Sequence, residues 1–481
     1  MVTEADVAFA HNFSSTVFQQ KSTDARFTEV TWQEIQPDST LSNTKTISFT
    51  IPRYSSPNLL LVNEMTLRVN ASLTINDKET QIPQEKDCSV VNNVLHSLFS
   101  QCKVYVENVQ TSENSENYPY KAIIIDALSC TSDAKCSVME AAGFYQDDPF
   151  PHGAIPDEGV VNRKHRFQRY AKTGRTTFDW IYTTQEACFI GRLHTDLSSI
   201  DGGILPNVEI KVVLERSLDD FVLLAKSNDN FKLNLTQASL YIPVATLNSK
   251  LYNQITRKLE EQPASIYYTR SQVIPCHIPL GSTYWFSQDL FSPKQLPSRM
   301  VLGFIPTKHF HGTKLTDPFK FLRKWTFEAR DLPYFARGLM SLNSDSPDEE
   351  VEAREFSTFV QRVYVTINGK SVDEWDTTAT KLDDTMNFYR MHSIMGFCKS
   401  REGNDVTERK FQLGKYLLCY DLTKALNADT DFLLPSVKNG SLRVAVQFTE
   451  SIPIELQMIC YAEFPSVMTI DSHGRVHCSF K

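Results

Sequence analysis

The chain has 481 residues, of which 41% are hydrophobic and 11% aromatic, and its formal net charge is −8. This length is enough for two or three domains with cores of their own, and abundant Phe and Tyr with only 17 Gly favour a packed β-rich protein over a disordered or fibrous one. The acidic balance argues against a chain built as a whole to neutralise nucleic-acid phosphates.

The Cys residues and the start of the chain bear on the cellular compartment. None of the ten Cys forms a CxxC pair, which argues against zinc-ribbon and thioredoxin-like sites. The first residues, MVTEADVAFAHNF, have neither the basic region nor the apolar stretch of a signal peptide, and no apolar run approaches the ~18 residues of a membrane span. We therefore expect reduced thiols in a protein made and kept inside the cell.

Residues 1–39 are polar and rich in Ser, Thr and Gln. Their aromatic residues, such as Phe9, Phe13 and Trp32, are scattered without a period. A segment of this kind is too sparse to form a domain and becomes ordered only where its few apolar side chains find a surface. We predict an N-terminal arm over 1–39, outside the core.

Alternating apolar residues, typical of strands, begin at Thr46. TISFTIPR alternates over 46–53 and ends at a proline, and LLLVNEMTLRVNASLTI over 59–75 is a second strand region with a break near Asn63 and Glu64. KVYVENV over 103–109 returns to the two-residue period.

Between these strands the spacing changes. VVNNVLHSLFSQ at 90–101 has apolar residues at helical spacing, and YPYKAIIIDALSC at 118–130 and SVMEAAGF at 137–144 are further short helical candidates. We expect them to be insertions between strands. Residues 145–170 are rich in Pro, Gly, Asp and Arg, and we expect a long loop there.

The second half of the chain repeats the pattern of the first half. The first-half segments, in order, are FSQCKVYVENVQ (99–110), CFIGRL (188–193), VEIKVVLERS (208–217) and LNLTQASLYIPVATL (233–247). The second-half segments are FVQRVYVTINGK (359–370), YLLCY (416–420), LRVAVQFTES (442–451) and IELQMICYAEFPSVMTI (454–470). Matched elements in the same order indicate a duplicated domain rather than a short solenoid repeat.

Two copies of a set of short alternating strands with wide loops predict an all-β protein made of two tandem jelly-roll β-sandwiches, a double jelly roll with short helical insertions. We place the first jelly roll at 40–247, a charged linker at 248–263, the second jelly roll at 264–471 and a C-terminal tail at 472–481. The alternation predicts buried side chains at representative positions of the repeated strands. These positions are Val212, Leu214, Val444, Val446 and Phe448.

The sequence predicts no catalytic, cofactor-binding or metal site. It lacks G-x-S-x-G, a phosphate loop, H-E-x-x-H and a dinucleotide fingerprint. His309 and His311 would share one face of a strand, but no third ligand lies at a suitable spacing. His473, His477 and Cys478 in the tail are a still weaker group.

The charge balance reverses in one segment, NRKHRFQRYAKTGR at 162–175, where aromatic residues interleave with cations. Contact with nucleic acid or with an acidic partner surface is one interpretation, and a solvated loop is the other. The candidate contact residues are Arg163, Lys164, Arg166, Arg169, Lys172 and Arg175.

Segments from both halves carry a family resemblance. They are NNVLHSLFSQCKVYV (92–106), YPYKAIIIDAL (118–128), GFYQDD (143–148), GRLHTDLSS (191–199), LPSRMVLGFIPTKHFHGTKLTDPFKF (296–321), FQLGKYLLCYDLT (411–423) and YAEFPSVMTID (461–471). In order, and over nearly the whole chain, they resemble Polinton/Maverick-type major capsid proteins, a protein type shared by adintoviruses. The departures are local. A hairpin tip that is usually Gly-Lys-like reads Asn-Val-Gln at 108–110, and Asp317 stands where Asn is commoner before Pro-Phe.

The resemblance implies a hexon-like major capsid protein without enzymatic activity or cofactor. It implies a homotrimer of double jelly rolls, hence a pseudo-hexameric capsomer, and an icosahedral shell around double-stranded DNA. The implied partners are other copies of this chain, neighbouring capsomers, a minor capsid or penton protein at the fivefold vertices, and packaged DNA in weak contact. The implied location is the virion capsid, assembled in the cytoplasm or nucleus of the host.

Two other classes of function remain open from the residues. Jelly rolls also host carbohydrate-binding and carbohydrate-active proteins, whose sites need exposed Trp beside paired carboxylates. The five Trp are scattered, and only Trp375 has an acidic residue directly on both sides. The other class is an intracellular scaffold that a host has retained from a capsid gene.

Overall fold

The fold is described from a computed structural model of the chain. The described residues are 26–41, 44–54, 57–76, 81–82, 88–112, 116–147, 158–172, 180–200, 202–204, 207–225, 230–291, 295–314, 316–325, 358–372, 376–380, 383–424, 426, 428 and 439–479. Most of the predicted arm, residues 1–25, therefore lies outside them, as do Arg175 and Trp375.

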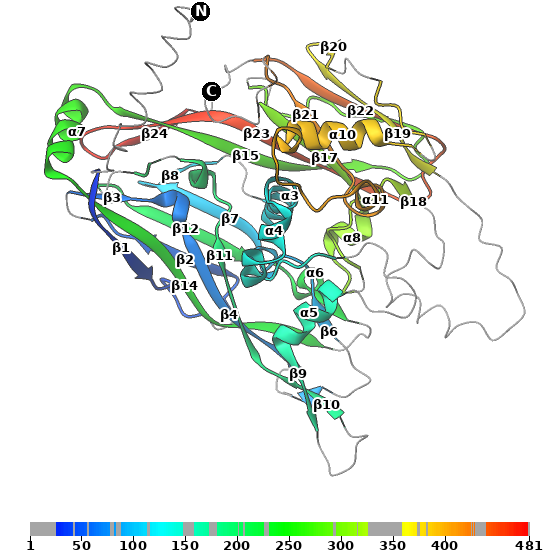
Figure 1. Cartoon of the computed structure of the whole chain (residues 1–481), viewed down its shortest axis with the longest axis horizontal. Coiled ribbons are helices and arrows are strands. Elements are labelled where there is room, and N and C mark those ends of the chain that lie inside the picture. Colours follow the sequence, from blue (N-terminus) through cyan, green and yellow to red (C-terminus); the bar gives the residue numbers. More distant parts are fainter. Residues whose placement is uncertain are drawn as a thin grey trace, which may run out of the picture.

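Two larger antiparallel sheets of the first half share a common core, and two smaller ones, β5-β10-β9 and β13-β6, lie beside them (Figure 1). One of the larger sheets has the strand order β1-β14-β4-β11, with β3 beside β14, and the other has the order β2-β12-β7-β8. The strands are β1 (Phe27–Ile35), β2 (Thr46–Ile51), β3 (Asn58–Leu60), β4 (Thr66–Ile75), β7 (Phe99–Val106), β8 (Val109–Gln110), β11 (Glu186–Arg192), β12 (Ile210–Arg216) and β14 (Phe231–Leu247).

The second half forms a matching pair of sheets. One has the order β15-β23-β17-β21, with β24 beside β23, and the other has the order β16-β22-β19-β18, with β20 beside β19. The strands are β15 (Ala264–Ile278), β16 (Tyr284–Phe286), β17 (Arg299–Pro306), β18 (Lys324–Trp325), β19 (Thr358–Ile367), β20 (Lys370–Ser371), β21 (Leu417–Asp421), β22 (Leu442–Phe448), β23 (Leu456–Ile470) and β24 (Val476–Ser479).

The two halves share one topology. The β19-β20 hairpin corresponds to the β7-β8 hairpin, and β3, β18 and β24 have no counterpart in the other half. When the eight corresponding strands of each half are numbered along the chain, one sheet has the order 1-8-3-6 and the other 2-7-4-5 in both halves. This is the arrangement of a jelly roll. The repeated sequence segments occupy equivalent places, because β7, β11, β12 and β14 correspond to β19, β21, β22 and β23. The predicted all-β double jelly roll is therefore confirmed.

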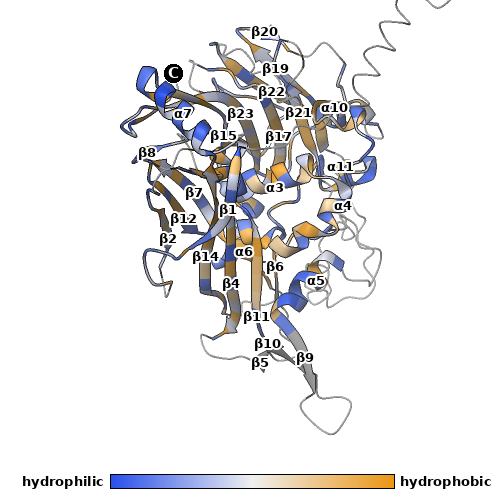
Figure 2. Ribbon diagram, turned by 60° about the vertical axis from the view of Figure 1, so that its left-hand side comes forward, coloured by the Kyte–Doolittle hydropathy of each residue, from blue (hydrophilic) through white to orange (hydrophobic). Residues whose placement is uncertain are grey.

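Alternation of apolar and polar residues places the core. In β4 every second residue from Leu67 to Ile75 is buried, because successive side chains of a strand point to opposite faces. Figure 2 shows this alternation as bands of hydrophobic and hydrophilic colour along the strands. All five representative positions of the repeated strands are buried, which confirms their predicted register: Val212, Leu214, Val444, Val446 and Phe448.

The predicted helical insertions are also present. They are α2 (Val94–Ser97), α3 (Tyr118–Ser129) and the 3₁₀ helix η2 (Val138–Ala142). The second half has α10 (Thr385–Ile394) and α11 (Glu408–Leu413) at the equivalent place, between the fifth and sixth strands of its jelly roll. Helix α3 is largely hydrophobic and contacts β7 on one side and β15 and β23 on the other, so it lies between the halves (Figures 1 and 2).

The remaining short elements complete the described chain. They are η1 (Val62–Glu64), β5 (Gln81–Ile82), β6 (Cys88–Val90), α4 (Ser132–Lys135), α5 (Glu158–Phe167), β9 (Gln168–Lys172), β10 (Trp180–Thr184), η3 (Asp196–Ser199), α6 (Asp219–Val222), β13 (Leu223–Ala225), α7 (Ser249–Glu261), α8 (Thr307–His311) and η4 (Phe397–Lys399). No described helix has the length and apolar character needed to cross a membrane.

Two predicted loops contain regular structure. The segment 145–170 was predicted as a long loop, but its described part holds α5 and the start of β9, which joins β10 and β5 in a small sheet. Helix α5 buries Arg163 and Phe167, which lie one turn apart. Because one of these two buried residues is charged, a search for apolar residues at helical spacing does not find this helix. The charged linker contains α7, whose N-cap Asn248 accepts a hydrogen bond from the Lys250 backbone N–H.

The ends of the sheets reach past the predicted boundaries. Within the segment predicted as an arm, β1 pairs along its length with β14. Within the predicted tail, β24 pairs with the end of β23. Backbone hydrogen bonding to a neighbouring strand orders both segments although their own side chains are polar or mixed. The boundaries of the two domains otherwise stay predictions.

Candidate functional site: the seam between the halves and the exposed edges

A buried carboxylate ties the two jelly rolls together. Asp196 lies at the start of η3, four residues after the end of β11. Its Oδ1 accepts hydrogen bonds from Lys121 Nζ of α3 at 2.7 Å and from Ser271 Oγ of β15 at 2.9 Å. Further bonds cross the same seam, from Tyr268 Oη to the Thr111 carbonyl at 3.0 Å and from the Thr269 backbone N–H to Ser199 Oγ at 2.8 Å. First-half residues thus hold the first strand of the second half in place.

A second connection uses a buried lysine. Lys135, at the end of α4, donates to the carbonyl of Ala127 at 2.7 Å and forms an ion pair with Asp405 of the second half. Burial lowers the pKa of Lys135, although Asp405 opposes this shift. Burial acts to raise the pKa of Asp405, but the attraction of Lys135 outweighs it, so this pKa is lowered overall. Asn404 also donates to the Ala127 carbonyl at 3.1 Å.

Aromatic packing makes the third connection. Tyr120 of α3 stacks on Phe310 of α8 with ring centroids 5.3 Å apart, and the Phe319 ring lies edge-on at 5.6 Å. Phe221 of the first half joins the same group. Because ion pairs, hydrogen bonds and rings all cross the seam, the two jelly rolls have one fixed relative orientation.

A small polar cavity lies at this seam. It is lined by Lys121, Thr195, Asp196 and Ser271 among others, and its volume of about 20 Å³ has room for about one water molecule. A cavity of this size does not hold a sugar ring or another organic substrate. The residues around this cavity therefore join the halves, and the cavity itself is too small for an organic substrate.

The basic segment at 162–175 was predicted to expose its cations for contact with a partner, but one of them is buried. Arg163 of α5 is 1% exposed, donates from Nε to the Val90 carbonyl at 2.9 Å and pairs with Asp147 at 2.6 Å. Its prediction as a nucleic-acid or partner contact is wrong, because its guanidinium is used inside the fold.

Of the other basic residues, Arg166 and Lys164 lie on α5, and Arg169 and Lys172 lie on β9. Arg166 donates to the backbone carbonyls of Glu140 and Cys188, and its guanidinium lies 4.9 Å from the centre of the Phe189 ring, so it fastens α5 to β11. Lys164 is half-buried on α5. Arg169 and Lys172 belong to β9, whose side chains are not described beyond Gln168.

Neither histidine group noted in the sequence, His309 with His311 or His473 with His477 and Cys478, is among the clusters of possible ligand atoms that the described residues form. His309 and His311 lie on the helix α8 and not on a strand, and residues two apart on a helix do not share a face. Burial, together with Lys320 and Lys308, lowers the pKa of His309 to about 4. His477 and Cys478 are adjacent on β24 and therefore point to opposite faces.

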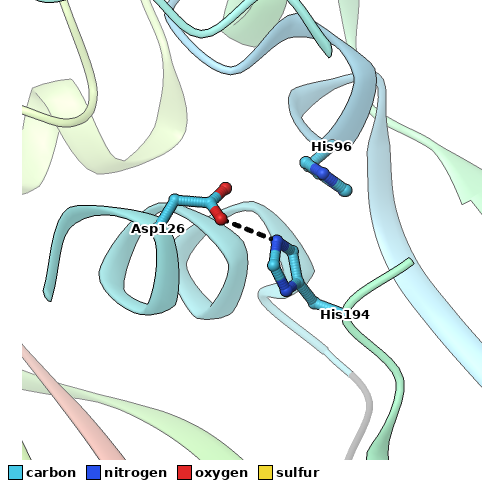
Figure 3. Close-up of side chains that lie close together, drawn as sticks. All are labelled: His96, Asp126 and His194. Carbon is cyan, nitrogen blue, oxygen red and sulfur yellow. Dashed lines mark ion pairs between the residues drawn. The ribbon is translucent and has the colours of Figure 1, made fainter. Parts of the chain in front are cut away.

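A different histidine cluster lies inside the first half, and sequence reasoning missed it. His96 of α2, Asp126 of α3 and His194 from the segment after β11 lie close together, with one possible ligand atom from each within 4.8 Å of the others (Figure 3). His194 Nε2 is 3.0 Å from Asp126 Oδ1, and the two imidazole rings are 4.6 Å apart. The three residues lie in separate elements, so their spacing in the sequence does not predict that they form a cluster.

Neighbouring polar groups orient this cluster. Tyr118 Oη lies 2.8 Å from His96 Nδ1 and also accepts a hydrogen bond from the His194 backbone N–H at 3.2 Å. Asn93 Nδ2 donates to Asp126 Oδ2 at 2.6 Å. Burial, reinforced by His194, lowers the pKa of His96 to about 3. Burial acts to raise the pKa of Asp126, but His194 and Asn93 lower it overall.

Exposed aromatic side chains mark two sheet edges. On the edge strand β1, Trp32 is 56% exposed and Val30 is 47% exposed. On the edge strand β16, Phe286 is 70% exposed and Tyr284 is 55% exposed. Edge strands that carry large apolar side chains are favourable places for contact with another chain.

The chain was compared with known proteins. No family model matches it. An uncharacterized protein of Caenorhabditis elegans is 24% identical over 396 residues, which cover 81% of this chain and 82% of the nematode protein.

Solved structures share the fold of this chain. The Sputnik virophage structure has a TM-score of 0.58 at 12% identity, over 96% of this chain and 90% of that one. The Faustovirus major capsid protein has a TM-score of 0.58 at 10% identity, over 97% and 94%. The mavirus major capsid protein has a TM-score of 0.50 at 10% identity, over 100% and 95%. These structural neighbours are viral double jelly-roll capsid proteins.

Proposed function

We propose that this chain is a major capsid protein of the hexon-like kind, which forms homotrimeric, pseudo-hexameric capsomers and an icosahedral shell around double-stranded DNA. The observation that supports this best is the duplicated jelly roll, matched over 90% or more of the Sputnik and Faustovirus chains. The neighbours are structural proteins, which supports a role without enzymatic activity.

The seam supplies the physical basis for such a block. A threefold axis acting on two similar barrels gives a ring of six, and that ring is nearly hexagonal only if the barrels have a fixed relative orientation. The connections made by Asp196, Lys135 and Tyr120 provide this orientation. Contacts around a threefold axis are heterologous and closed, and a permanent trimer should bury more than about 2,000 Å² in total.

The remaining parts of the proposal concern partners. Nearly hexagonal blocks tile a shell but leave the fivefold vertices to another protein, so a penton or minor capsid protein is needed there. Lys164, Arg169, Lys172 and Arg175 remain candidates for weak contact with packaged DNA or with an acidic neighbour. We propose the virion capsid as the location, with assembly inside the host cell.

The test is the oligomeric state and the assembled form. Light scattering of the purified chain should give a mass of about 165 kDa, three times the 54.9 kDa of one chain, and electron microscopy at higher concentration should show closed particles. A chain that stays monomeric at micromolar concentration would overturn the proposal.

The nematode relative favours a second candidate, an intracellular scaffold that a host has retained from a capsid gene. Both candidates predict that the chain assembles, so the presence of packaged DNA inside the assemblies distinguishes them. Particles purified from cells that express the native gene should protect DNA from nuclease if the chain is a working capsid protein. Assemblies that repeatedly protect no nucleic acid would favour the retained scaffold.

A further inference from the structure

We propose that His96, Asp126 and His194 form a binding site for a divalent transition metal ion of the Zn²⁺ class, which joins α2, α3 and the segment after β11. The proposal is independent of the capsid role. It also replaces the expectation from the sequence that the chain holds no metal.

The geometry is close to that of a three-ligand site. One ligand atom from each residue lies within 4.8 Å of the others, and His194 Nε2 and Asp126 Oδ1 are already 3.0 Å apart. Zinc bonds of about 2.0–2.2 Å in a tetrahedron place ligand atoms roughly 3.4 Å apart. Shifts of about 1 Å in the ligand atoms would therefore bring all three to zinc-binding distances, and Figure 3 shows the three side chains close together.

The donor set selects the class of metal. Two imidazoles and one carboxylate suit first-row divalent ions such as Zn²⁺, Fe²⁺, Co²⁺ and Ni²⁺, whereas Ca²⁺ and Mg²⁺ prefer oxygen ligands throughout. Three protein ligands leave a fourth position for water. Asn93 Oδ1 is buried without a hydrogen-bond partner among the described residues, and its amide already binds Asp126. It therefore provides an acceptor for such a water.

The surrounding hydrogen bonds match those of a metal site. Ligating imidazoles usually donate from the other ring nitrogen to a fixed acceptor, and ligating carboxylates are themselves hydrogen-bonded. Tyr118 Oη is placed to accept from His96 Nδ1, which leaves Nε2 for the metal, and Asn93 holds Asp126 Oδ2, which leaves Oδ1. The cluster is thus oriented before any ion binds.

A metal here would act on the seam between the halves. His194 is two residues before Asp196, whose carboxylate reaches across to β15. Fixing His194 to α2 and α3 therefore restricts the segment that positions Asp196. We expect the ion to stiffen the connection between the two jelly rolls rather than to catalyse a reaction.

The experiment is a zinc titration of chelator-stripped full-length protein against a chromophoric competitor. We expect one Zn²⁺ per chain and a rise in melting temperature on binding. His194→Ala should weaken binding at least 100-fold, and Tyr118→Phe should weaken it about 10-fold, because it removes only an orienting bond. His311→Ala, which changes an exposed histidine on α8, should leave the affinity unchanged.

Absorption spectroscopy of the Co²⁺ form identifies the type of ligand, and the variant Asp126→Asn separates loss of a ligand from unfolding. Co²⁺ in place of Zn²⁺ should give visible bands of a tetrahedral nitrogen and oxygen site. A strong thiolate band would place the metal on Cys and overturn the proposal, as would binding that His194→Ala leaves intact. Asp126→Asn keeps the shape of a buried side chain, so loss of binding with an unchanged circular dichroism spectrum separates ligand loss from unfolding.

Discussion

The two halves have the same strands but bury different polar groups beside their helical insertions. In the first half, Asp126 of α3 faces two histidines. In the second half, Asp384 precedes α10, pairs with Arg323 at 3.2 Å and accepts a hydrogen bond from Asn387 at 2.6 Å. The strands of the two halves match because the alternation of apolar and polar residues is enough to decide which face of each strand is buried. The polar residues of each helical insertion differ because they contact different neighbours in the two halves.

The electrostatic consequence differs between the halves. Burial raises the pKa of Asp384 to about 6, and the attraction of Arg323 only partly opposes this. Asp126 has its pKa lowered overall. One half thus holds a carboxyl that is easily protonated and the other holds one that stays ionised, although the surrounding strands correspond. The pH response should therefore differ between the halves.

The largest effect should come from the matched core positions of β12 and β22. Phe448→Ala should lower the free energy of unfolding by about 3–5 kcal/mol and its counterpart Leu214→Ala by about 2–5 kcal/mol, because both side chains are buried. Denaturant unfolding measures the change, and Lys211→Ala on the exposed face of β12 is the control. A loss under about 1 kcal/mol at either core position would show that the two strands are not equivalent.

Breaking the seam should cost nearly as much. Lys135→Met leaves Asp405 buried without its nearest cation, and we expect a loss of about 3 kcal/mol in the free energy of unfolding. The double variant with Asp405→Leu should recover most of this loss, because no uncompensated charge then remains. If the double variant is as unstable as the single one, the ion pair is not what joins the halves.

A pH series should separate the two carboxyl groups. The folded-state pKa of Asp384 lies above the ordinary 3.8, so the stability from its protonation is present below 3.8 and is lost as pH rises through about 6. Asp384→Asn should remove this part of the pH dependence, on the order of 2 kcal/mol, from thermal unfolding curves between pH 4 and 6.5.

The neighbouring Asp383 provides the matched control for this series. Hydrogen bonds from Thr385 lower the pKa of Asp383, so its contribution has the opposite sign and is lost as pH falls. Asp383→Asn should therefore keep the slope that Asp384→Asn removes. Equal slopes in both variants would show that Asp384 titrates normally.

The smallest effect on stability should come from the exposed edges. Trp32→Ser on β1 and Phe286→Ser on β16 should change the unfolding free energy of the chain by less than about 0.5 kcal/mol, since both side chains face solvent. If these edges contact other copies, the same variants should shift the light-scattering mass toward the monomer. A trimer unchanged by both substitutions would place its contacts elsewhere.

Periodicity predicted the repeated strands and the helical segments α2, α3 and η2, but not β1, β24, α10 or α11. The two-residue alternation in segments such as 208–217 and 442–451 depends only on neighbouring residues, so it can be read without knowledge of what lies opposite. The order of repeated segments then indicated the duplication and the double jelly roll. The segment of α5 was missed because its buried face is partly made by Arg163, whose partners Asp147 and Val90 lie elsewhere in the chain.

The sequence by itself determined the fold class, because local alternation and its repetition are properties of short stretches. Only the tertiary structure decided which polar residues meet. Asp196 meets β15, Lys135 meets Asp405, and His96, Asp126 and His194 converge, through contacts between distant segments that no spacing encodes. The tertiary structure also decided that Arg163 is buried, because burial depends on the elements that pack against a residue. It placed His309 and His311 on the helix α8 rather than on a strand.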